Sequence, residues 1–161
     1  MGYRSDVRFV VALPSEAERN SIMALYSMHP LVQQCDMAQQ WTPYEVMLRD
    51  YGRYVDVPKG KPSDVYTREY PVYLLSYDDK DVKWYDNYED VQAVMHMEEL
   101  LDSLEGRCYA YRFIRVGEEH SDIECRENSS EDETGEQLYE YLENIMYTEV
   151  NLVCDIKQIE A

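Results

Sequence analysis

The sequence lacks long apolar runs and is poor in basic residues. No stretch approaches the roughly 20 apolar residues of a membrane-spanning helix, and the opening residues lack the apolar core of a signal peptide. Only 15 Lys and Arg stand against 33 Asp and Glu, which gives a net charge of −18. We therefore expect a cytoplasmic protein that binds neither membrane nor nucleic acid, since DNA-binding surfaces are rich in Lys and Arg.

Common catalytic and redox motifs are also absent. The chain contains no Gly-rich phosphate loop, no G-x-S-x-G turn and no H-E-x-x-H helix. Its four cysteines form no Cys-x-x-Cys pair, and we expect buried free thiols, as in most cytosolic proteins. We predict no catalytic residue and no cofactor. The cysteines are Cys35, Cys108, Cys125 and Cys154.

Potential metal ligands occur in small groups only. Two ligands without a second cluster are a weak zinc signal, and a run of aspartates without the glycine and terminal glutamate of an EF-hand is a weak calcium signal. We therefore predict no metal site. The groups are His96 with Glu99, His120 with Asp122, and Asp78, Asp79 and Asp81 in a predicted turn.

A strand hairpin followed by a helix is predicted twice, over 70–104 and 108–145. In the first unit, apolar and aromatic residues fill two strands around a polar turn at 78–81, and a helix follows Asn87. In the second, strands at 108–116 and 121–126 precede a helix that runs from Thr134 to Ile145. The polar return strand of this second hairpin is predicted to lie at a sheet edge.

The flanking segments complete the predicted fold. A strand over 6–13 precedes a helix capped by Ser15, and the Thr-Pro-x-Glu signature at 42–45 predicts a second helix. A loop over 53–69 and a long final strand over 146–156 follow. We expect one α+β domain spanning 1–161, a mostly antiparallel sheet with helices on one face in the order β-α-α-β-β-α-β-β-α-β.

The negative charge is concentrated in the second part of the chain. Residues 1–60 hold seven acids and six bases, whereas 61–161 hold 26 acids and nine bases. Two predicted helices carry three acids each at i, i+4 and i+7, a spacing that costs about 0.2–0.5 kcal/mol per like-charged pair. We call Glu98, Asp102 and Glu105 the first acidic triad, and Glu136, Glu140 and Glu143 the second acidic triad.

Carboxylates spaced about 5–6 Å apart along a helix can imitate a row of DNA phosphates. This interpretation predicts binding to a basic, nucleic-acid-binding protein, and the alternative is that the acids only keep the protein soluble. The predicted contact surface consists of both acidic triads, extended at the hairpin turns by Asp78, Asp79, Glu118 and Glu119.

Tyrosine is abundant, with 16 residues in the chain. Most are expected to pack on the sheet with a solvated hydroxyl, but tyrosine is also favoured at interfaces. This composition favours an alternative function as a structural or assembly protein that forms a homo-oligomer. The tyrosines predicted to be available to a partner are Tyr85, Tyr88, Tyr139 and Tyr147.

Four short segments resemble small uncharacterised phage proteins. They are MGYRSDV at 1–7, VKWY at 82–85 with YEDV at 88–91, and IRVGE at 114–118, while the long acidic helix before the last strand departs from that pattern. The resemblance implies a phage origin and transfers no activity. Since phages use small acidic proteins against host nucleases, it implies by analogy an inhibitor of a CRISPR or restriction complex that acts by DNA mimicry. A third hypothesis is a small-molecule binder or hydrolase with a site in the 53–69 loop.

Overall fold

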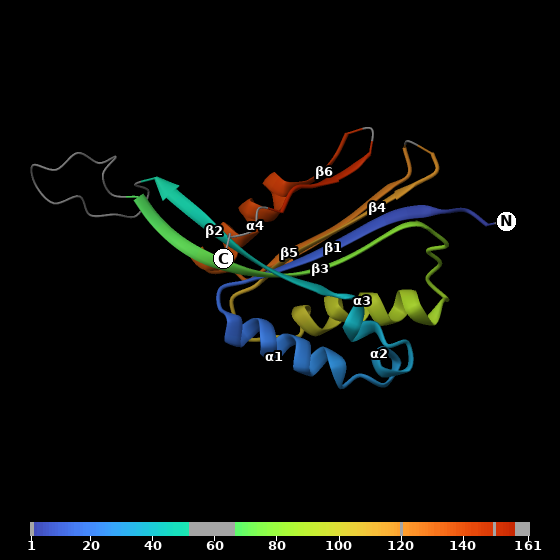
Figure 1. Cartoon of the computed structure of the whole chain (residues 1–161), viewed down its shortest axis with the longest axis horizontal. Helices are drawn as coiled ribbons and strands as arrows, with labels where there is room; N and C mark the ends of the chain where they lie inside the picture. Colours follow the sequence, from blue (N-terminus) through green and yellow to red (C-terminus); the bar gives the residue numbers. More distant parts are fainter. Residues whose placement is uncertain (1, 52–66, 120, 150, 157–161) are drawn as a thin grey trace, which may run out of the picture.

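The computed structural model describes residues 2–51, 67–119, 121–149 and 151–156 (Figure 1). Five antiparallel strands form one sheet in the order β2-β3-β1-β4-β5, so that β1 is central and β5 lies at an edge. The strands are β1 Ser5–Leu13, β2 Thr42–Tyr51, β3 Thr67–Val82, β4 Ala110–Gly117 and β5 Ile123–Ser129.

Helices cover both faces of this sheet (Figure 1). On one face lie α1 Glu16–Ser27, α2 Pro30–Gln34, the short 3₁₀ helix Met37–Gln40 and α3 Glu89–Asp102. On the other lies α4 Glu133–Ile145, followed by a small hairpin of β6 Met146–Thr148 and β7 Leu152–Cys154. No described helix is long and apolar enough to cross a membrane.

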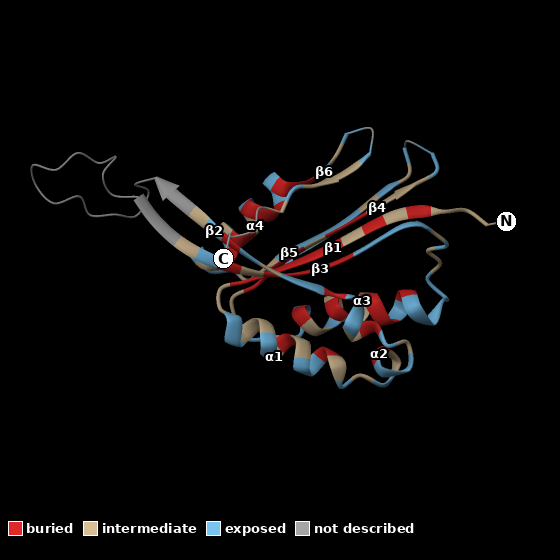
Figure 2. Ribbon diagram, in the orientation of Figure 1, coloured by how far each residue is buried: buried red, intermediate tan, exposed pale blue. Residues whose placement is uncertain are grey.

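The alternation of β1 explains the two hydrophobic cores. Phe9 and Val11 point to the α1–α3 side, whereas Val10 and Ala12 point to the α4 side. All four side chains are fully buried, because β1 has a strand on each edge and helices on each face. Figure 2 shows this burial continuing along the neighbouring strands.

The α+β class and the antiparallel sheet are confirmed, and the order of elements roughly follows the predicted one. The placement of all helices on one face is wrong, since α4 packs through Leu138 and Leu142 against the face opposite α3. The physical reason is that β1, β3 and β4 are apolar on both sides. A sheet that is apolar on both faces needs other elements packed against each face.

Two segments adopt a secondary structure other than the predicted one. The segment 42–51 is strand β2 rather than a helix, because it pairs residue by residue with β3 from Thr42 opposite Ser76 to Tyr51 opposite Thr67. Pro43 is tolerated there because β2 is an edge strand. The predicted turn at 78–81 belongs to β3, which continues to Val82 with a register shift against β1 and a positive φ of 55° at Asp81.

The predicted final strand over 146–156 is also wrong, because the chain folds back on itself there. β6 and β7 are three residues long each and pair with one another, apart from the main sheet. The strands of the second hairpin, helix α4 and the Ser15 cap of α1 are confirmed, since Ser15 Oγ accepts from the Glu18 amide at 3.1 Å. Within the predicted 53–69 loop, β3 begins at Thr67, and residues 53–66 lie outside the described part of the chain.

Candidate functional site

The first acidic triad is largely engaged by the protein itself. Arg126 of β5 lies against Glu98 of α3, with its Nε donating to Oε2 at 2.6 Å and its Nη2 contacting Oε1. The Glu98 side chain is only 12% exposed, whereas that of Arg126 is 52% exposed. The charge of Glu98 is therefore neutralised inside this molecule and is poorly placed to meet a partner.

Asp102, the last residue of α3, also has internal partners. Its two carboxylate oxygens accept from the Tyr111 hydroxyl at 2.9 and 3.0 Å, and Oδ1 accepts from Asn128 Nδ2 at 3.0 Å. Burial, followed by this hydrogen bond, raises the pKa of Tyr111 well above its ordinary value. Glu105 lies beyond the helix end and is exposed, just before the positive-φ Gly106. Asp102 thus anchors α3 to β4 and β5.

The second acidic triad is exposed along the outer side of α4. The helix is capped by Asp132, whose Oδ1 accepts from the Gly135 amide at 2.6 Å, and this bond lowers the pKa of the Asp132 carboxyl. Its inner side is buried through residues such as Leu138, Leu142 and Ile145. The three glutamates therefore face solvent: Glu136, Glu140 and Glu143.

Within the described part of the chain, the side chains of Glu136 and Glu143 form no hydrogen bond or ion pair. The neighbouring carboxylate of Glu127, on β5, is paired with Arg112 and accepts from the Tyr139 hydroxyl of α4 at 2.6 Å. This hydrogen bond is the main cause that raises the pKa of Tyr139 to about 12, and the charge of Glu143 adds to it. The local potential around α4 is consequently negative.

The acids of the second hairpin turn lie at the far end of the sheet, where Gly117 pairs with Ser5. Glu118 Oε1 accepts from the Arg4 amide at 2.8 Å, and the Glu119 amide donates to the Tyr3 hydroxyl at 3.2 Å. Both side chains are exposed. The turn thus holds the chain that precedes β1 and presents two carboxylates to solvent.

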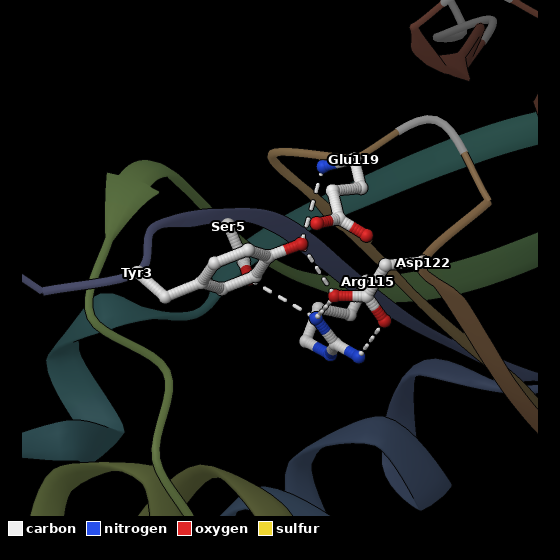
Figure 3. A network of polar contacts seen from close by, with 5 residues as sticks. All are labelled: Tyr3, Ser5, Arg115, Glu119 and Asp122. Carbon is white, nitrogen blue, oxygen red and sulfur yellow. Dashed lines mark hydrogen bonds and ion pairs between the residues drawn. The ribbon is translucent and has the colours of Figure 1, made fainter.

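Figure 3 shows the polar network behind this turn. Asp122 accepts from the Tyr3 hydroxyl at 2.7 Å and from both terminal nitrogens of Arg115, at 3.1 and 2.8 Å. The bonds from Arg115, and then that from Tyr3, lower the pKa of Asp122 to about 2. Arg115 also donates to Ser5 at 3.2 Å, so β1, β4 and the turn are fastened together. We interpret the network as structural because each of these polar groups has a partner.

Asp78 and Asp79 lie on β3, on the other side of β1 from the hairpin turn. Asp78 is 3.8 Å from Arg8, and Asp79 accepts from the Lys80 amide at 3.0 Å. They border a cleft of about 530 Å³ between the sheet and the β6–β7 hairpin. Arg8 and Lys80 line the same cleft, so its charge is mixed.

The potential metal ligands do not form a site in the described residues, where no group of three suitable side chains gathers. His96 Nδ1 lies 3.4 Å from Glu99, but the His96 ring also packs against that of His29, with centroids 3.8 Å apart. Asp122 is bound by Arg115, and its predicted companion His120 lies outside the described residues.

The ten predicted contact residues therefore do not form one continuous row. The first triad lies on α3 or just beyond it and the second on α4, on opposite faces of the sheet, while the hairpin acids lie at its end (Figure 1). Sequence reasoning missed Arg126 as the neutralising partner of Glu98. The available signal was a single basic residue, Arg126, among the acids of the polar edge strand at 124–127.

The sequence matches no protein family and no curated protein. The geometry of the acidic surfaces therefore carries the functional argument.

Proposed function

We propose that the protein acts by binding, and that the outer side of α4 presents the second acidic triad to a basic, nucleic-acid-binding surface of a host protein. One observation carries this proposal: the three glutamates are exposed on a helix that contains no basic residue. No Lys or Arg occurs between Arg126 and Lys157, although this segment contains nine acids. The negative charge there has no nearby basic residue in sequence to balance it.

The spacing of the triad supports DNA mimicry. Residues three and four apart on a helix have Cβ atoms about 5–6 Å apart, and duplex DNA carries about one charge per 1.7 Å of its axis. A row of carboxylates on a rigid helix would occupy Lys and Arg side chains that otherwise bind phosphates. The bound protein would then exclude DNA or RNA by competition.

The resemblance of the opening segment to small phage proteins suggests the class of partner. Under this proposal, the target is a host defence complex of the CRISPR or restriction type, and the protein inhibits it without catalysis. Glu118 and Glu119 would extend the contact from the hairpin turn. The first triad has a smaller role, because Glu98 and Asp102 are engaged internally.

The test uses the triple variant Glu136→Lys, Glu140→Lys and Glu143→Lys in an affinity capture from host lysate. A matched control reverses Glu16, Glu45 and Glu89, three exposed acids away from α4, and changes the net charge by the same amount. Wild type and control are expected to capture a basic complex at about 0.1 M salt and to lose it at about 0.5 M. The triple variant is expected to capture none.

Two further measurements make the result specific. Excess duplex DNA should release the captured complex if both compete for one surface, and far-UV circular dichroism should show that each variant is folded. Equal capture by the triple variant, or a complex that DNA does not displace, would contradict the proposal.

Assembly through tyrosines has weaker support. Tyr88 and Tyr147 are 38% and 39% exposed, but they lie on different elements, at the start of α3 and on β6. The other two predicted interface tyrosines have internal partners: Tyr85 accepts from the Tyr3 amide, and Tyr139 donates to Glu127. Light scattering that showed a salt-insensitive oligomer would favour this alternative.

A further inference from the structure

The edge of the sheet at β5 is open. β5 pairs with β4 on one side, and in the described part of the chain no strand pairs with its other side. Ile123 is 45% exposed, and the side chains of 125–128 are exposed as well. Unpaired backbone amides and carbonyls at such an edge can add a strand from another protein.

A pocket of about 290 Å³ lies beside this edge, between α3 and β5. Trp84 and Met95 supply apolar surface, and four acidic residues line it together with Arg126. These acidic residues are Asp86, Glu98, Glu99 and Glu124. An apolar surface with negative charge around it suits a long basic side chain, because Lys and Arg bury their carbon chains and keep the charge near the surface.

The protein's own Arg126 shows that this environment binds a guanidinium. It is bound to Glu98, which leaves three acidic lining residues, Asp86, Glu99 and Glu124, for another cation. The Glu99 side chain is 80% exposed, and its Oε2 lies 3.4 Å from His96 Nδ1. Glu124 forms no ion pair within the described chain. The pocket therefore keeps a net negative charge after its internal pair is counted.

We propose that β5 and this pocket bind an extended basic segment of a partner protein. The segment pairs its backbone with β5, and one Lys or Arg side chain enters the pocket, where Met95 and Trp84 contact its carbon chain. Its charge lies near Glu99 and Glu124. Charge complementarity favours this occupant over a second copy of the chain, whose β5 would bring further glutamates to the same edge.

The backbone geometry adds a specificity rule. Successive side chains of a strand point to opposite faces, so every second residue of the bound segment would face the α3 side. Arg126 and Asn128 of β5 already do so, since they contact Glu98 and Asp102. Basic residues at alternate positions are therefore preferred to a contiguous run. This surface is separate from the outer side of α4, so it can fail or hold independently of the proposed function.

The test uses a fluorescein-labelled synthetic peptide as long as β5, with Arg alternating with Thr. Fluorescence anisotropy measures its affinity for the whole protein and for the double variant Glu99→Gln with Glu124→Gln. The matched control is Glu136→Gln with Glu143→Gln, which removes the same charge from α4. We expect the first pair to weaken binding about tenfold or more, and the control pair to change it by about twofold or less.

Backbone pairing is tested separately. The same peptide is also prepared with N-methyl groups on two consecutive central residues. Because successive backbone amides of a strand point to opposite edges, neither edge of this peptide can then donate at its centre, and its affinity should fall at least tenfold. The unmodified peptide should also slow amide hydrogen exchange at 123–129. Absence of peptide binding, equal binding of the N-methylated peptide, or equal binding to both pairs of variants would overturn the proposal.

Discussion

Helices α3 and α4 carry acidic residues at the same spacing, but these residues have different surroundings. Each is associated with three acids at i, i+4 and i+7, and each buries an apolar side against the sheet. On α3, Glu98 binds Arg126 and Asp102 binds Tyr111 and Asn128. On α4, the side chains of Glu136 and Glu143 have no hydrogen bond or ion pair within the described chain.

Sequence spacing therefore identifies an acidic side of a helix, whereas the side chains packed around that helix decide whether the charge is available to a partner. α3 lies beside side chains of β4 and β5 that donate hydrogen bonds, and its acids hold the layers together. The acids of α4 project away from the sheet. Exposed acids that do not hold the layers together are better candidates for binding, and replacing the two kinds of acid should affect stability differently.

The largest effect is expected from removing the buried anchor of α4. Leu142 is fully buried, so Leu142→Ala should lower the free energy of unfolding by about 2–5 kcal/mol. Leu101→Ala on α3 is the matched variant, since Leu101 is also fully buried. Urea denaturation measures both. A loss below about 1 kcal/mol at Leu142 would show that α4 is not held on the sheet as described.

A smaller loss of stability is expected when the acids are replaced by alanine, and only on α3. Asp102→Ala removes the acceptor of the buried Tyr111 hydroxyl and should lower the free energy of unfolding by about 1–3 kcal/mol. Glu143→Ala, the control on α4, should change it by about 0.5 kcal/mol or less. Equal losses at the two positions would remove the distinction between the helices.

Local signals in the sequence predicted much of the fold. The Ser15 cap of α1, the second hairpin and α4 depend on contacts within a few residues, and all are confirmed. Segment 42–51 carried an equally good helix signal, but ten backbone pairs with β3 override it. A pattern within one segment contains no information about a strand that pairs from a distance.

The same limit applies to the candidate site. The sequence identified both acidic triads as sides of helices, but it did not show that the chain crosses to the other face of the sheet after β5. It also did not show that Arg126 meets Glu98, 28 positions away. Availability of a charge is a property of tertiary structure, which explains why Glu98 and Asp102 of the predicted contact surface are engaged internally.

Within the second acidic triad, charge reversal at the two end positions should change the free energy of unfolding in opposite directions. Glu143 lies in the last turn of α4, near the negative end of the helix dipole, so Glu143→Lys should raise the free energy of unfolding by about 0.5 kcal/mol. Glu136 lies in the first turn, where a negative charge is favourable, and Glu136→Lys should lower it by a similar amount. Thermal denaturation at low salt measures both. A stabilised Glu143→Lys variant that has lost its partner would show that this acid serves binding at a cost in stability.

The smallest difference is in the ionisation of two tyrosines, one on each side of the sheet. Tyr111 is buried and bonded to Asp102, whereas Tyr139 is partly exposed and bonded to Glu127, which raises its pKa to about 12. The bond to Glu127 favours the neutral phenol. Its stabilising contribution is therefore complete below the ordinary tyrosine pKa of about 10 and is lost as pH rises through about 12.

An NMR titration of the tyrosine ring carbons should show Tyr139 ionising before Tyr111. Glu127→Gln should move the pKa of Tyr139 back toward about 10 and leave Tyr111 unchanged, because the charge that holds the proton is gone. If Tyr111 ionises together with Tyr139 or earlier, the α3 side is more open to solvent than its contacts imply. The internally bonded acids of α3 and the exposed acids of α4 would then differ less in solvent exposure than their contacts indicate.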